Sequence, residues 1–191
     1  TEGRQINTGD LYFDASPIDE QGLSFKVFAG APDSYLEWRY FLPKESRMLD
    51  FSVHFHNLER VLDPGQADLP LAWSQLAPSQ ELDAEIERSR TTIYYQTEDE
   101  SVSRIGRGGA NEEEIDESLR WISFKQQFFC NALILNDGLF KRPVTAKAGV
   151  PNEEDSTVNM AFLANLSLPY SYQPQEQVSM RWFMGPLHYQ T

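Results

Sequence analysis

The sequence predicts an all-β fold of antiparallel strands with one or two short helices. Apolar and polar residues alternate along much of the chain, which is typical of strands that bury one face. Turn residues separate these segments, and a single stretch has helical character. The chain has 191 residues, of which 40% are hydrophobic and 13% aromatic, so we expect one domain over residues 1–191.

Three segments show the alternation most clearly. They run from Leu49 to Phe55, from Val158 to Leu168 and from Val178 to Met184, and Pro169 ends the second. Weaker candidates bring the expected total to about eleven strands. These weaker candidates are residues 11–13, 23–28, 35–42, 71–76, 91–96, 119–124, 128–135 and 144–148.

Turn and cap residues mark the connections. Asn136-Asp137-Gly138 predicts a tight turn between two strands, and Asp63-Pro64-Gly65 predicts a longer one. A helix is expected from Gln80 to Arg88 with Ser79 as its N-cap. Residues 98–117 are acidic and rich in glycine, so we expect a mobile surface loop that contributes no core strand.

The charge of the chain restricts its partners. Sixteen basic and 29 acidic residues give a formal net charge of −13 and a pI near 4.6. This charge argues against binding along nucleic-acid phosphates and against charge-driven docking on anionic lipid.

Cys130 is the single cysteine, which excludes an internal disulfide, and its apolar neighbours predict a small core residue.

No membrane span or signal peptide is visible in the sequence. The longest apolar runs fall short of the roughly 18 residues that a span requires. Because the chain begins at Thr1 and ends at Thr191 just past an apolar strand, we expect a domain excised from a longer membrane protein.

A metal site has one candidate. His54 and His56 lie on one face of a predicted strand together with Asp50 and Ser52, close enough to share a metal ion. The same alternation also explains all four as the polar face of a half-buried strand, and His188 is distant in sequence.

Catalytic motifs are missing from the sequence. The segment Ile105–Gly109 lacks the Lys-Ser or Lys-Thr of a phosphate loop, and Glu112–Asp116 lacks the spacing of an EF-hand. No Gly-x-Ser-x-Gly elbow occurs, and nothing singles out a pair of carboxylates. We therefore expect no enzyme activity, and we assign no catalytic, cofactor-binding, metal or partner-binding residue.

Aromatic residues offer a binding alternative. They could line a groove that stacks on sugars or holds apolar peptide side chains, although the same residues also suit a core. The residues in question are Trp38, Trp73, Trp121, Trp182, Tyr94 and Tyr95.

The segment LRWISFKQQFFCNALIL, residues 119–135, carries a family resemblance. It resembles a strand pair in the periplasmic domain of bacterial YidC-type membrane protein insertases, in particular Bacteroidetes-like members. Further segments match in the same order, and they are residues 37–42, 50–57, 91–95 and 181–186.

The resemblance implies a twisted antiparallel β-supersandwich, similar to galactose mutarotase and aldose epimerase domains, held in the periplasm of an inner-membrane protein. It implies contact with SecD/SecF of the Sec machinery, and with nascent membrane proteins or extended peptides in a cleft. It transfers no insertase residue and no cofactor, because the insertase core lies in membrane helices. A soluble carbohydrate-binding or sugar-modifying β-sandwich protein is the alternative.

The most distinctive motif receives a structural interpretation. We expect Phe128 and Phe129 to pack between the sheets, while Gln126 and Gln127 serve a bend or a strand edge.

Overall fold

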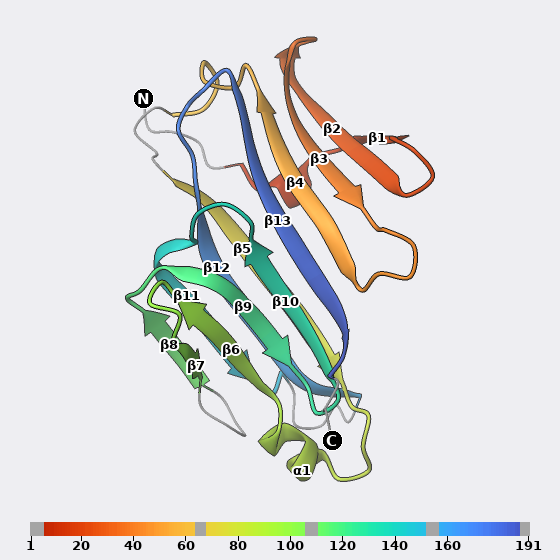
Figure 1. Ribbon diagram of the computed structural model, residues 1–191, viewed down its shortest axis with the longest axis vertical. Helices are drawn as coiled ribbons and strands as arrows, with labels where there is room; N and C mark the ends of the chain where they lie inside the picture. The colour runs from red at the N-terminus through yellow and green to blue at the C-terminus, as the bar shows by residue number, and fades with distance from the viewer. Residues whose placement is uncertain (1–5, 64–67, 106–110, 152–156, 188–191) are drawn as a thin grey trace.

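The structure is a computed structural model that describes residues 6–63, 68–105, 111–151 and 157–187. These residues form two antiparallel sheets, one of nine strands and one of four (Figure 1). The all-β prediction is confirmed. Pro64 and Gly65 of the predicted Asp63-Pro64-Gly65 turn, residues 106–109 of the glycine-rich segment, and His188 lie outside the described residues.

The large sheet contains nine strands: β1 (Asp14–Pro17), β2 (Gly22–Ala31), β3 (Ser34–Phe41), β4 (Met48–His56), β6 (Thr92–Thr97), β7 (Val102–Arg104), β9 (Leu119–Lys125), β10 (Phe129–Leu135) and β13 (Gln175–Pro186). The small sheet contains four: β5 (Asp68–Pro78), β8 (Asn111–Ile115), β11 (Lys141–Gly149) and β12 (Val158–Pro169). The orders are β1-β2-β3-β4-β13-β10-β9-β6-β7 and β5-β12-β11-β8.

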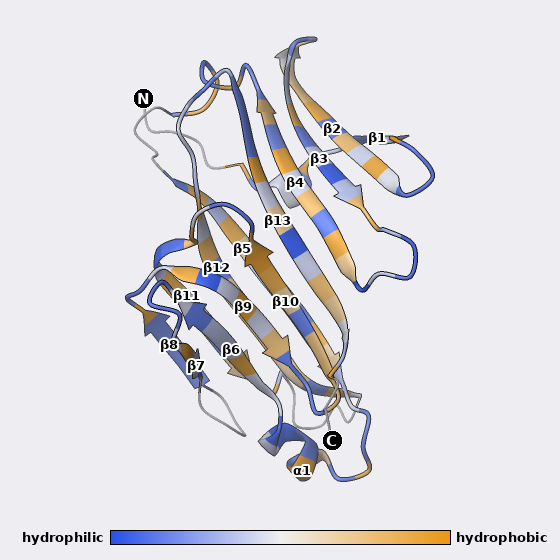
Figure 2. Cartoon of the chain, viewed as in Figure 1, coloured by the Kyte–Doolittle hydropathy of each residue, from blue (hydrophilic) through white to orange (hydrophobic). Residues whose placement is uncertain are grey.

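The strands with clear alternation form where the pattern places them. Figure 2 shows hydrophobic and hydrophilic bands along β4 and β13, which are direct neighbours in the large sheet. The weaker candidates from residue 23 onward also lie in strands. The first candidate, at 11–13, is wrong, because the strand is β1 at residues 14–17. All four residues of β1 are exposed, so its sequence carries no alternation to detect.

The acidic segment contains two strands. The prediction of a surface loop over residues 98–117 that contributes no core strand is wrong, because β7 and β8 lie within this segment and Ile115 of β8 belongs to the core. In β8, Ile115 is 4% exposed, whereas Glu112 and Glu114 remain in water on the other face. Lys147 of the neighbouring strand β11 lies 3.2 Å from the Glu112 carboxylate and offsets its charge. An acidic sequence can therefore form an edge strand when one of its side chains is buried and the others face water.

The described residues include two short helical segments, α1 (Ala84–Ser89) and the 3-10 turn η1 (Thr8–Asp10). The helix starts later than predicted, because Asp83 and not Ser79 is its N-cap. The Asp83 carboxylate accepts hydrogen bonds from the N–H groups of Glu85 and Ile86 at 3.1 and 3.0 Å. Buried Glu87 accepts hydrogen bonds from the N–H groups of Gln80 and Glu81, which tie the segment before the helix to the helix itself.

The core lies between the two sheets and is strongly aromatic. Trp73 of β5 stacks on Phe124 of β9 with ring centroids 4.0 Å apart, and Phe124 stacks on Phe162 of β12 at 4.8 Å. Trp182 of β13 meets Trp73 edge-on at 5.9 Å. Each such pair contributes about 0.5–1.5 kcal/mol beyond simple burial, so these rings hold the sheets together.

The small sheet covers only part of the large one. β1, β2 and β3, which we call the β1–β3 wing, extend to one side beyond the small sheet (Figure 1). The main contacts of β2 and β3 are with each other and with their neighbours β1 and β4. Among the described residues, the small sheet therefore leaves the wing uncovered, and each face of the wing carries a distinct group of side chains.

Candidate functional site: an aromatic cleft and a charged cluster on the wing

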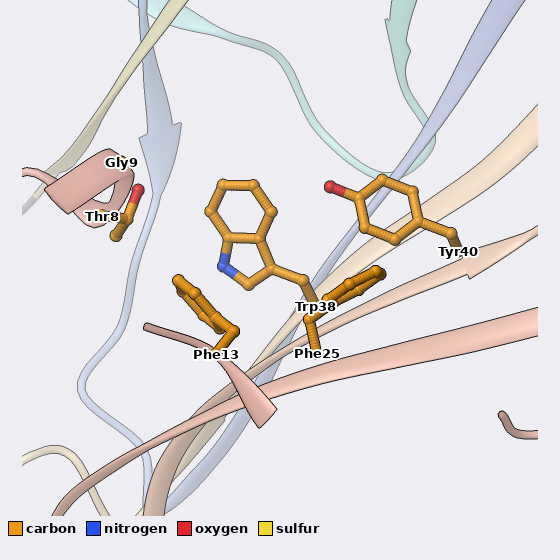
Figure 3. A pocket seen from close by; sticks show the side chains of 6 residues that line it. All are labelled: Thr8, Gly9, Phe13, Phe25, Trp38 and Tyr40. Atoms are coloured by element: carbon orange, nitrogen blue, oxygen red, sulfur yellow. The ribbon is translucent and has the colours of Figure 1, made fainter. Parts of the chain in front are cut away.

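The inner face of the wing forms an aromatic cleft of about 430 Å³. In Figure 3, Trp38 lies at the centre of the cleft between Phe13 and Tyr40, and Thr8 and Gly9 lie at the left. Phe25 of β2 lies directly opposite Trp38 of β3 and completes the lining. Alternation places these rings on the face that continues the core surface of β4.

Ring contacts anchor the cleft to the rest of the sheet. Phe51 of β4 stacks on Tyr40 at 4.8 Å and meets Trp38 at 5.5 Å. Phe13, which precedes β1, lies 5.8 Å from Trp38. Burial raises the pKa of Tyr40, so its hydroxyl remains protonated at neutral pH. The cleft thus has rigid aromatic walls and suits the apolar parts of a ligand.

The indole N–H of Trp38 is buried and has no hydrogen-bond partner among the described residues. A buried donor without a partner has lost its hydrogen bond to water, so this N–H group lowers the stability of the fold.

The aromatic residues singled out in the sequence do not share one groove. Trp38 lines the cleft, whereas Trp73 and Trp182 meet in the core. Tyr95 is also buried, and its hydroxyl donates to Glu113 at 3.2 Å. Trp121 lies on the opposite face of β9 from core residue Ile122. The sequence could not separate these roles, because alternation is identical for covered and uncovered strands.

The outer face of the wing carries a charged cluster around Glu37. The Glu37 carboxylate accepts hydrogen bonds from Ser24 at 2.6 Å and from Arg39 at 2.8 Å, and Lys26 lies 3.6 Å away. Burial by itself would raise the pKa of Glu37. The hydrogen bonds from Arg39 and Ser24 and the nearby positive charges outweigh burial and lower this pKa to about 2.

The histidine pair belongs to this cluster. Glu37 lies directly opposite His54 in the register of β3 and β4, and His56 Nε2 is 4.0 Å from its carboxylate. Ser52 hydrogen-bonds His54 at 2.9 Å, and Tyr35 stacks on His56 at 4.2 Å. Burial lowers the pKa of both histidines, which favours neutral rings at neutral pH.

The predicted polar face therefore exists, but it is packed around a buried carboxylate. Glu37, whose burial no local pattern signalled, was missed in the sequence. Within the described parts of the chain, no three His, Cys, Asp or Glu side chains are grouped to hold a metal ion.

Two expectations about the 119–138 segment are corrected. Phe128 and Phe129 are 47% and 48% exposed, so they do not pack between the sheets. They lie where β9 turns into β10, beyond the edge of the core, whereas Phe124 occupies the buried position. Gln126 and Gln127 do lie at a bend, as predicted. Cys130 is half-buried and opposite Lys125, on the outer face and not in the core.

The architecture defines a class, a sandwich of two antiparallel β-sheets. A solved Escherichia coli K12 structure, provisionally assigned as an aldose 1-epimerase, aligns with a TM-score of 0.51 over 92% of this chain and 69% of its own. Sequence identity between the two is 8%, so this likeness concerns the fold alone. No protein-family model matches the chain.

Curated relatives are similar to the chain along almost its whole length. The membrane protein insertase YidC of Porphyromonas gingivalis (strain ATCC 33277) is 29% identical over 98% of this chain, and that of Parabacteroides distasonis is 27% identical over 96%. YidC of Phocaeicola vulgatus is 23% identical over the whole chain. The chain is thus homologous to one segment of Bacteroidetes YidC proteins, which confirms the resemblance.

The matched segment is a minor part of each relative. The chain spans 30% of the Porphyromonas and Phocaeicola proteins and 28% of the Parabacteroides protein. Among the described residues, no helix has the length and apolar character that crossing a bilayer requires.

Proposed function

We propose that this chain is a noncatalytic interaction domain of a YidC-like insertase, located in the periplasm beside the inner membrane. In this role it contacts SecD/SecF of the Sec machinery or segments of membrane proteins during insertion. The supporting observation is a match over almost the whole chain to proteins named as insertases, of which it spans about 30%. The remaining length of such a protein would carry the insertion activity.

The aromatic cleft is the surface that we assign to this contact. Its Phe, Trp and Tyr rings suit the apolar side chains of an extended segment, and rigid aromatic rings lose little conformational entropy on binding. Charge plays little part within the cleft itself, since none of its lining residues is ionised at neutral pH.

Site-specific photocrosslinking in the full-length parent protein tests this role. A photoreactive residue at Phe25 or Tyr40 is expected to capture SecD/SecF or a membrane protein during its insertion. The matched control is Leu76, which is 62% exposed on β5 and distant from the cleft. Equal capture from Leu76, or no capture from the cleft, would count against the proposal.

The periplasmic location has a simpler test. The reading frame around this segment is expected to encode one apolar helix upstream and several downstream. A parent gene that encodes no flanking membrane helix would refute the location and the insertase role together.

The charged cluster favours a second candidate, a carbohydrate-binding or sugar-modifying protein. A carboxylate, a guanidinium and two imidazoles on one sheet face offer donors and acceptors that suit a hydroxyl-rich ligand. A glycan array and a mutarotation assay test this directly. We expect neither to respond, and a sugar signal that Glu37→Gln abolishes would favour the second candidate over the first.

A further inference from the structure

A second pocket, of about 370 Å³, lies at the bend that carries the distinctive Lys-Gln-Gln-Phe-Phe motif. Its walls come from the end of α1, from the outer face of β6 and from the bend between β9 and β10. The lining residues are Ser89, Arg90, Thr92, Tyr94, Lys125, Gln127 and Phe128. The aromatic cleft shares none of these residues, so the pocket is a separate site.

The lining carries two positive charges and no acid. The Lys125 ammonium donates to the carbonyls of Arg90 and Gln126 at 3.1 and 3.3 Å, which fixes its position in the wall. Arg90 is exposed and makes no ion pair within the described ranges, so its guanidinium is available for a bidentate contact. In a chain of net charge −13, this local excess of cations indicates an anionic ligand.

Two other lining residues narrow the kind of anion. The Gln127 Oε1 atom is buried and has no hydrogen-bond partner among the described residues, so turning this amide toward a ligand N–H sacrifices no hydrogen bond. The Phe128 ring, 47% exposed at the rim, offers an apolar surface. A carboxylate, an adjacent N–H and an apolar side chain occur together in the C-terminal residue of a peptide.

We propose that this pocket binds the C-terminal residue of a peptide that ends in an apolar side chain. Arg90 and Lys125 hold the carboxylate, Gln127 accepts from the backbone N–H, and Phe128 packs against the side chain. An anionic membrane surface is disfavoured as the source of the anion, because it would be repelled by the overall charge of −13. A single carboxylate is small enough to interact mainly with Arg90 and Lys125, so the distant negative charges of the chain affect it less.

Isothermal titration calorimetry on this chain, with N-acetyl-Ala-Phe as the free acid and as the C-terminal amide, tests the proposal. The acid is expected to bind roughly 10- to 100-fold more tightly than the amide, as charge-assisted hydrogen bonds predict. Arg90→Gln and Gln127→Glu should each weaken binding of the acid about tenfold or more. Lys125→Arg, which keeps the charge, should retain binding.

Arg120→Gln is the matched control, because Arg120 is an exposed arginine of β9 outside the pocket. It should leave binding unchanged, and circular dichroism of each variant checks folding. Equal binding of acid and amide, or no heat from either peptide, would overturn the proposal. Displacement of the peptide by inorganic phosphate at equal concentration would also overturn it, in favour of a general oxyanion site.

Discussion

Arg39 donates a 2.8 Å hydrogen bond to Glu37, a carboxylate that is 3% exposed although it lies on the outer face of the large sheet. Its neighbours on β2, β3 and β4 cover it, so the charge is buried by side chains and not by a second layer. A buried carboxylate is stabilised only when it is paired, and here the pairing is nearly complete.

The Glu37 contacts predict a pH-dependent stability. Because the folded-state pKa of Glu37 is about 2 and its ordinary value is 4.5, the stabilisation is full above pH 4.5 and is lost as pH falls toward 2. Glu37→Gln should lower the free energy of unfolding by roughly 1.5–3 kcal/mol at neutral pH. Near pH 2 the variant and the parent should converge, as measured by urea denaturation.

Glu20→Gln serves as the control, since Glu20 is exposed and takes no part in this cluster. A Glu37→Gln loss that is equal at neutral pH and near pH 2 would show that the carboxylate charge is not the cause.

Trp73 should be the tryptophan with the largest effect on stability. It is 8% exposed and contacts both Phe124 and Trp182 across the sheets. Trp73→Ala is expected to cost about 3–5 kcal/mol in urea denaturation. Trp121→Ala, on the outer face, should cost clearly less, and comparable losses would contradict the two-sheet core.

Trp38→Phe should change the free energy of unfolding by less than about 1 kcal/mol, because the indole N–H that it removes has no partner in the described structure. Trp38→Ala removes the aromatic wall and should cost about 2 kcal/mol or more. Chemical denaturation of both variants provides the comparison. If Trp38→Phe lowers the free energy of unfolding as much as Trp38→Ala does, the indole N–H makes a stabilising contact that the structure does not show.

Phe128→Ser should shift stability by no more than about 0.5 kcal/mol, since its ring is 47% exposed. Phe124→Ala, only four residues away and fully buried, should cost about 3–5 kcal/mol. Thermal melts of the pair measure the contrast. A large loss for Phe128→Ser would indicate that the ring packs inward.

Much of the sheet structure was predictable because alternation reports burial on one face. The pattern located β4, β12 and β13, and the Asn136-Asp137-Gly138 turn, where Gly138 has a φ of 90°. It missed β7 and β8, since edge strands can pair through their backbones while most side chains stay in water.

By itself, the sequence determined the all-β class, most strand positions and the relationship to YidC, because these depend on local pattern and ordered motifs. Tertiary structure alone decided which apolar rings became core and which became the cleft. Trp38 and Trp73 both lie on inward faces of strands, yet only Trp73 is covered by an opposing sheet. Which strand faces which sheet is a long-range property that no local spacing encodes. The burial of Glu37 depends instead on the pairing of β3 with β2 and β4, which brings Ser24, Lys26 and His56 beside its carboxylate.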